Sequence, residues 1–350
     1  MFYLVYLDDA QINPELSSMR IDSGFFSTGG MTMLCAALCA LSTSKFPQPG
    51  PRIRELDFHG SNAGDIFDDS AIESLCDLIR ASAWLQNLWF GACGLSSRCF
   101  QSLGSALRVC TSLQQLDLSH NDFGCKGFVA IGAALRFNTS IQILMLNGCH
   151  GIKISMNGIE ELAESLKVNR SLQDLWINHV GIDFSGAAYI ADALRLNSSL
   201  RILEMSSNMI GDDGAELLGA ALRVNSRLER LDVSDNKIGE RGAASFGNAL
   251  LANVSLQKLF LGGNKIGDAG AMALAAALRV NSTSTSIELG SCNIGDGGAV
   301  ALGEALCVNS AMMELRIYRN KIGDLGEESI LKAQEVNPRL ETIQLFPFRF

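Results

Sequence analysis

Cysteine and histidine are the residues of this sequence most able to carry nucleophilic or metal chemistry, and their spacing favours neither. The 350 residues include 10 Cys and 4 His, with no CxxC pair and no His beside Cys at metal-ligand spacing. The sequence also lacks GxSxG, HExxH and a glycine-rich phosphate loop. We therefore expect no metal, no cofactor and no enzymatic activity.

Charge and composition limit the classes of partner. The 28 basic residues face 37 acidic ones, a net charge of -9, and no basic run appears, which argues against nucleic acid. An acidic protein favours basic partners. The apolar stretch from Met31 to Leu41 is too short to span a bilayer, so no membrane partner is expected.

The cysteines also indicate a compartment. Ten in 350 residues are too sparse for a disulfide scaffold, so reduced thiols are expected. The first residues, MFYLVYLDDA, lack the positive region and the cleavage site of a signal peptide. We expect a cytoplasmic monomer.

The elements that position the remaining polar and aromatic residues follow from an internal repeat of 28 residues. SLRILEMSSNMIGDDGAELLGAALRVN from Ser199 returns as SLQKLFLGGNKIGDAGAMALAAALRVN from Ser255. The pattern predicts one domain over 1–350: a segment at 1–15, eleven repeats at 16–337 with longer loops in the first two, and a terminal strand and cap at 338–350. The first leucine position of the regular units falls at Leu85, Leu113, Ile141, Leu172, Leu200, Leu228, Leu256, Ser284, Met312 and Leu340.

Each repeat predicts one strand and one helix. L-x-x-L-x-L has the period of a strand buried on one face, and G-A-x-x-L-x-x-A-L has helical spacing. Asp268 and Asp296 stand where an N-cap belongs, and asparagines such as Asn309 stand where a left-handed C-cap is expected.

A second set of asparagines, such as Asn264, should satisfy backbone groups in the buried turn after each strand. Cys93, Cys149 and Cys292 take that position in three units, which predicts packing roles for these thiols.

These units resemble leucine-rich repeats of the ribonuclease-inhibitor-like class, from about Leu16 to Leu345. The spacing and the IGDxGAxxL pattern are most similar to the repeat domains of nucleotide-binding leucine-rich-repeat immune receptors, although the sequence has no P-loop. The fold expected is an α/β, right-handed leucine-rich-repeat solenoid, a horseshoe with parallel strands on its concave face and helices on its convex face.

In such a fold the strand positions between the committed leucines are free to bind a partner. The position between the second and third leucine carries exposed aromatic and acidic side chains, which suit a basic protein surface. The alternative is that Trp89 and Trp176 fold over neighbouring strands or lie under the N-terminal segment. The candidates from this position are Trp89, Asp117, Met145, Trp176, Glu204, Asp232, Phe260, Glu288 and Arg316.

A second candidate patch lies near the C-terminus, where Arg316, Tyr318, Arg319 and Lys321 fall on one strand and the turn after it. Arginine and tyrosine together suit an acidic peptide or a phosphate group. The alternative is an ordinary solvated end strand.

The function predicted is a non-enzymatic scaffold that binds an unidentified protein on the concave face. Two alternatives stay open. One is GTPase activation, by resemblance to the Ran GTPase-activating protein, although that family has an acidic C-terminal tail and this sequence ends in FPFRF. The other is inhibition of a basic enzyme such as a ribonuclease.

Overall fold

A computed structural model describes residues 18–22, 28–42, 53–59, 69–148 and 156–346. Contacts divide the chain into two compact units, unit 1 over 1–175 and unit 2 over 176–350. The division falls inside strand β6 (Asp174–Trp176) and not at a change in the repeat pattern. The predicted segment at 1–15, Cys149 and the last four residues of the predicted cap lie outside the described residues. The single domain over 1–350 stays a prediction.

Strand and helix alternate through unit 1, as the repeat predicts. Its strands pair in parallel with their neighbours in chain order. The elements are β1 (Ser18–Asp22), α1 (Thr28–Ser42), β2 (Glu55–His59), α2 (Asp69–Ala81), β3 (Asn87–Trp89), α3 (Cys99–Leu107), β4 (Gln115–Asp117), α4 (Gly124–Leu135), β5 (Ile143–Met145) and α5 (Met156–Val168).

Unit 2 follows the same order, again with parallel pairing between successive strands. Its elements after β6 are α6 (Phe184–Leu196), β7 (Ile202–Glu204), α7 (Gly211–Leu222), β8 (Arg230–Asp232), α8 (Glu240–Leu250), β9 (Lys258–Phe260), α9 (Gly267–Leu278), β10 (Ser286–Glu288), α10 (Asp296–Val308), β11 (Glu314–Arg316), α11 (Asp324–Val336) and β12 (Thr342–Gln344).

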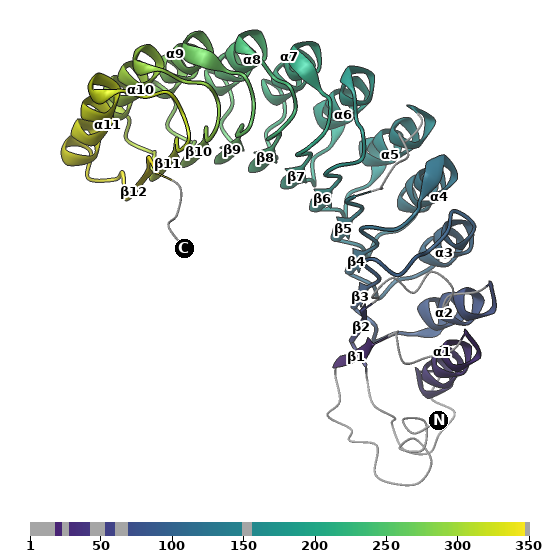
Figure 1. Ribbon diagram of the computed structural model, residues 1–350. Helices are drawn as coiled ribbons and strands as arrows, with labels where there is room; N and C mark the ends of the chain where they lie inside the picture. Colours follow the sequence, from purple (N-terminus) through teal and green to yellow (C-terminus); the bar gives the residue numbers. More distant parts are fainter. Residues whose placement is uncertain (1–17, 23–27, 43–52, 60–68, 149–155, 347–350) are drawn as a thin grey trace. The chain divides into compact units, whose positions relative to one another are not determined.

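The core of each unit lies between its strands and its helices, which pack on one side of the strands (Figure 1). The middle strand residue points to the helices: Leu231, Leu259 and Ile287 are fully buried. Alanines and leucines of the helices, such as Ala271 and Leu274, close the core from the other side. The opposite side of the strands is covered by no described helix of the same unit, and we call it the open strand face.

The asparagine of the turn after each strand satisfies buried backbone groups, as predicted. Asn264 Nδ2 donates to the carbonyls of Val233 (3.0 Å) and Leu261 (2.8 Å), and its Oδ1 accepts from the backbone N of Ile238 (3.0 Å) in the preceding unit. Cys292 Sγ makes the equivalent contact to the Leu261 carbonyl at 3.3 Å. Burial raises the pKa of the Cys292 thiol to about 12, so it stays protonated.

The left-handed C-cap predicted for the second set of asparagines is wrong where the structure defines it. Asn309 has φ −71° and ψ 136°, an extended backbone. This conformation lets its Nδ2 donate to Leu278 O (2.6 Å) and Asn281 O (2.8 Å) of the preceding unit. Its Oδ1 accepts from the backbone N of Met312 at 2.7 Å. These asparagines therefore join successive loops between helix and strand in a second ladder.

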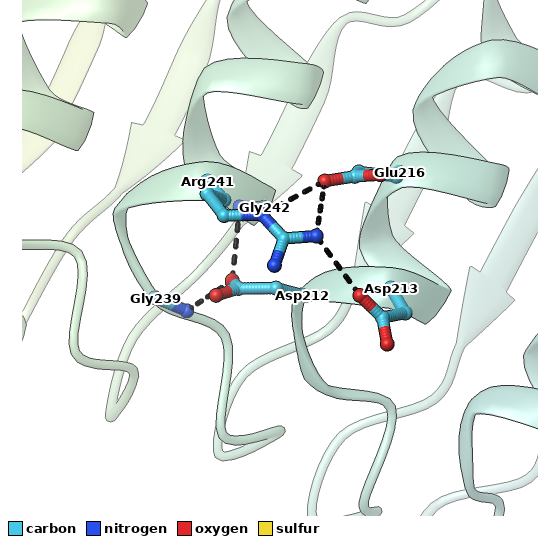
Figure 2. Close-up of polar contacts among 6 residues, drawn as sticks. All are labelled: Asp212, Asp213, Glu216, Gly239, Arg241 and Gly242. Carbon is cyan, nitrogen blue, oxygen red and sulfur yellow. Dashed lines mark hydrogen bonds and ion pairs between the residues drawn. The ribbon is translucent and has the colours of Figure 1, made fainter.

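The predicted N-caps are also corrected, because the aspartates act on the next helix along. Asp212, inside the first turn of α7, accepts from the backbone N of Gly239 (2.7 Å) and Gly242 (2.9 Å) at the start of α8 (Figure 2). A Cβ on Gly242 would lie 2.9 Å from Ala215 Cβ, so glycine permits this close approach of the helices. Asp268 and Asp296 cap α10 and α11 in the same way.

Candidate functional site

Strand register places the predicted positions in two rows on the open strand face. In unit 1, Asp57, Trp89, Asp117 and Met145 are successive Cα partners. In unit 2, the row runs through Glu204, Asp232, Phe260, Glu288 and Arg316. Because these residues alternate with the buried leucines, their side chains point away from the helices.

A hollow of about 520 Å³ opens on this face of unit 1, over β1 to β4. Trp89 and Asp117 line it, so two of the predicted residues meet in one concave site. Arg20, Glu55 and Asp57 line it as well. Trp89 is half-buried, which leaves part of the indole exposed to a ligand.

The hollow has an acidic excess. Three carboxylates line it with one guanidinium, and Arg20 Nε is 3.7 Å from Asp57 Oδ2. Asn87 donates to Glu55 Oε1 at 3.1 Å, and Asp117 Oδ1 accepts from the backbone N of Ser119 at 2.8 Å. These contacts fix the carboxylates in orientation and leave their charge uncancelled. The site can therefore attract a cationic group next to an aromatic face.

In unit 2 the predicted exposure of Glu204 is wrong. Only 4% of the residue is exposed, because Arg230 from the next strand covers it, with Nε 2.5 Å from Glu204 Oε1. Burial and the nearby Asp232 raise the pKa of Glu204 to about 7, and Arg230 opposes that rise. This group of side chains is already occupied by its own contacts.

Phe260 and Glu288 are likewise buried, against the prediction. The Arg230 guanidinium lies over the Phe260 ring, 4.5 Å from its centroid, so the ring faces a protein cation in place of solvent. Glu288 turns back to the chain and accepts from the backbone N of Gly262 and Gly290, both at 2.8 Å. Burial raises the Glu288 pKa and these bonds lower it in part.

The C-terminal patch does not leave its arginine and tyrosine available together. Arg316 pairs with Glu314 of the same strand at 2.7 Å, and Tyr318 hydrogen-bonds Glu288. Arg319 is exposed, with a left-handed φ of 55°. Trp176 is half-buried, and its Nε1 is buried with no hydrogen-bond partner.

Three residues of the open strand face were missed by the sequence analysis: Arg20, Glu55 and Arg230. Glu55 and Arg230 stand two residues before Asp57 and Asp232, on the same face of their strands. The period of two could have identified them, since it gives each strand two outward positions.

Comparisons with known proteins support the repeat class. Five segments match the family described as Leucine Rich repeat, at residues 109–132, 196–219, 224–247, 252–275 and 280–303. A search of curated proteins gives no match.

Solved structures give distant similarity. Leiomodin-1 Actin-Binding Site 2 aligns with 24% identity and a TM-score of 0.34, over 39% of this chain and 80% of that one. The leucine-rich repeat-containing protein LegL7 from Legionella pneumophila aligns with 16% identity and a TM-score of 0.48, over 93% of this chain and 90% of that one.

The fold is thus an α/β leucine-rich repeat solenoid, in which parallel strands alternate with helices. The chain itself carries leucine-rich repeats. Within the described ranges, no helix has the length and apolar character needed to cross a bilayer. The same ranges hold no group of three or more His, Cys, Asp or Glu side chains placed to bind a metal ion.

Proposed function

We propose that this chain is a non-enzymatic scaffold that binds a partner protein on the open strand face around Trp89. The hollow next to Trp89 is the observation that carries the proposal. It joins an aromatic anchor to Glu55, Asp57 and Asp117. An interface of this composition suits a lysine or arginine side chain on a basic partner surface.

The repeat class is consistent with a scaffold, since outward strand residues vary while the leucines are committed to the core. The finer expectations belong to the same proposal: repeats of the ribonuclease-inhibitor-like class, a cytoplasmic location and a monomeric chain. Buried thiols such as Cys35 and Cys76, whose pKa burial raises to about 12, suit a reducing compartment.

The test is comparative capture from a lysate of the source cells, after cross-linking, on three immobilised proteins: wild type, Trp89→Ala and Trp84→Ala. Trp84 is the matched control, because it is an exposed tryptophan in the loop between α2 and β3 and lies outside the hollow. We expect a partner that the wild type and Trp84→Ala retain and Trp89→Ala loses. Loss of a central aromatic anchor costs about 2 kcal/mol or more, roughly thirtyfold in affinity.

Asp117→Asn tests the electrostatic part of the proposal, since asparagine keeps the acceptor for Ser119 N and removes one charge. Binding to a basic partner should weaken and become less sensitive to salt. Equal capture by wild type and Trp89→Ala, with both folded by circular dichroism, would contradict the proposal. A captured basic enzyme whose activity falls on titration with the chain would identify the scaffold as an inhibitor.

A further inference from the structure

The loops between helix and strand in unit 2 form an edge with exposed apolar side chains that the fold does not use. Leu196, Val224, Val280, Val308 and Val336 each precede a ladder asparagine and are 55 to 69% exposed. The asparagine ladder joins these loops directly: Asn309 donates to Asn281 O, as Asn281 does to Asn253 O. The apolar side chains therefore lie in one row, which we call the helix-end edge.

The helix-end edge is also the basic side of unit 2. The six loops, at residues 195–201, 223–229, 251–257, 279–285, 307–313 and 335–341, hold six arginines and three glutamates. At the opposite edge, the helix starts at 183–189, 211–217, 239–245, 267–273, 295–301 and 323–329 hold ten acidic residues and one arginine. The arginines of the helix-end edge are Arg195, Arg201, Arg223, Arg227, Arg279 and Arg339.

Helix energetics explains only part of this arrangement. Cations at helix C-termini and anions at N-termini complement the helix dipole. The dipole does not call for apolar side chains in water, and Val254 of the same edge is 76% exposed. A continuous row of exposed apolar side chains marks a surface for a protein or a membrane.

We propose that the helix-end edge of unit 2 binds peripherally to the surface of an anionic lipid bilayer. The apolar side chains protrude from the loops, and the interface between headgroups and acyl chains accepts protruding side chains at any spacing. A protein partner would need a matched pocket for each of them. Guanidinium groups such as those of Arg195 and Arg223 would meet the anionic headgroups.

The acidic edge does not cancel this attraction. A helix of 12 residues such as α7 is about 18 Å long, whereas charges are screened over about 8 Å at physiological ionic strength. An anionic surface at the helix-end edge therefore interacts mainly with the arginines there. Such contact needs no spanning helix, so it is compatible with the short apolar stretch noted in the sequence.

The test is co-sedimentation of the full chain with vesicles of phosphatidylcholine alone or with 30% phosphatidylserine. We expect binding to the anionic vesicles only, and its loss in 0.5 M NaCl. Val224→Ser, Val280→Ser and Val308→Ser together should weaken binding about tenfold or more. Arg195→Gln or Arg223→Gln should each weaken it about fivefold.

Matched controls come from the acidic edge. Phe184 and Leu325, at the starts of α6 and α11, are 54% and 68% exposed. The pair Phe184→Ser and Leu325→Ser removes exposed apolar surface as well, and should bind the anionic vesicles like the wild type.

A second measurement locates the contact. Tryptophan emission of Val280→Trp should shift to shorter wavelength on addition of anionic vesicles, and that of Leu325→Trp should not. The proposal is overturned if the wild type does not sediment with anionic vesicles, or if the acidic-edge variant loses binding as much as the helix-end variant. Vesicle binding that is absent while a captured protein depends on Val224, Val280 and Val308 would instead assign the edge to a protein partner.

Discussion

Single residues of this chain are predictable where every unit repeats them. Asn264 and Cys292 share a position because an amide Nδ2 and a thiol Sγ both reach the carbonyl exposed 31 residues earlier. Glu204 has no such repeat. Its burial depends on Arg230, which arrives from the next strand 26 residues later, and a sequence pattern does not show that an outward position is covered. The buried acid has a consequence for stability.

Glu204 should make the protein less stable as pH rises through neutrality. Burial and Asp232 raise its folded pKa from 4.5 to about 7, so the folded state holds a proton that the unfolded state releases. The stabilisation is fully present below pH 4.5 and is lost as pH rises through about 7, by at most about 3 kcal/mol. Urea unfolding from pH 5 to 8 should show the decline in the wild type and a smaller one in Glu204→Gln.

Glu341→Gln is the control for this titration, because Glu341 is exposed on the loop before β12. It should decline with pH as the wild type does. A Glu204→Gln protein with the full decline would show that other groups cause it, and Arg230, the cation that faces Glu204, would then hold the carboxylate ionised.

At the scale of elements, the sequence places each helix correctly and assigns its capping residues to the wrong helix. The aspartate of IGDxGA stands at a helix start, as the dipole favours. Only the stacking of helices shows that Asp268 Oδ1 reaches Gly295 N and Gly298 N of α10, at 2.6 and 3.1 Å. These bonds join neighbouring units, so the aspartate contributes to their docking as well as to a cap.

Asp268→Ala should therefore lower the free energy of unfolding by about 1 kcal/mol, the usual value of an N-cap. Asp324 is the matched control: it has the equivalent position in α11, after which the described chain contains no further helix to cap. Asp324→Ala should change the stability by less than about 0.5 kcal/mol. Urea denaturation of the two variants beside the wild type measures both, and equal losses would show that the aspartates act on their own helices.

At the scale of the whole molecule, the period of 28 predicts the alternation of strand and helix because each unit buries its leucines only against its neighbours. It does not predict the hollow beside Trp89, since that site needs Arg20 and Glu55 from units with irregular spacing. Nor does it predict the division inside β6, where the repeat continues unchanged. Sites on this chain arise from the outward residues, which the repeat leaves unspecified.

Because contacts join nearest neighbours, damage in one unit should stay local. Asn264→Ala leaves the buried carbonyls of Val233 and Leu261 without their donor, a loss of about 2 kcal/mol. Amide hydrogen exchange should then lose roughly thirtyfold protection in β8 to β10, while β2 to β4 keep theirs. Asn121→Ala, the equivalent change in unit 1, should show the reverse pattern, since Asn121 donates to Phe90 O and Leu118 O. Equal loss of protection in all strands from either variant would show instead that the solenoid unfolds as one cooperative body, and that its repeats are coupled well beyond their neighbours.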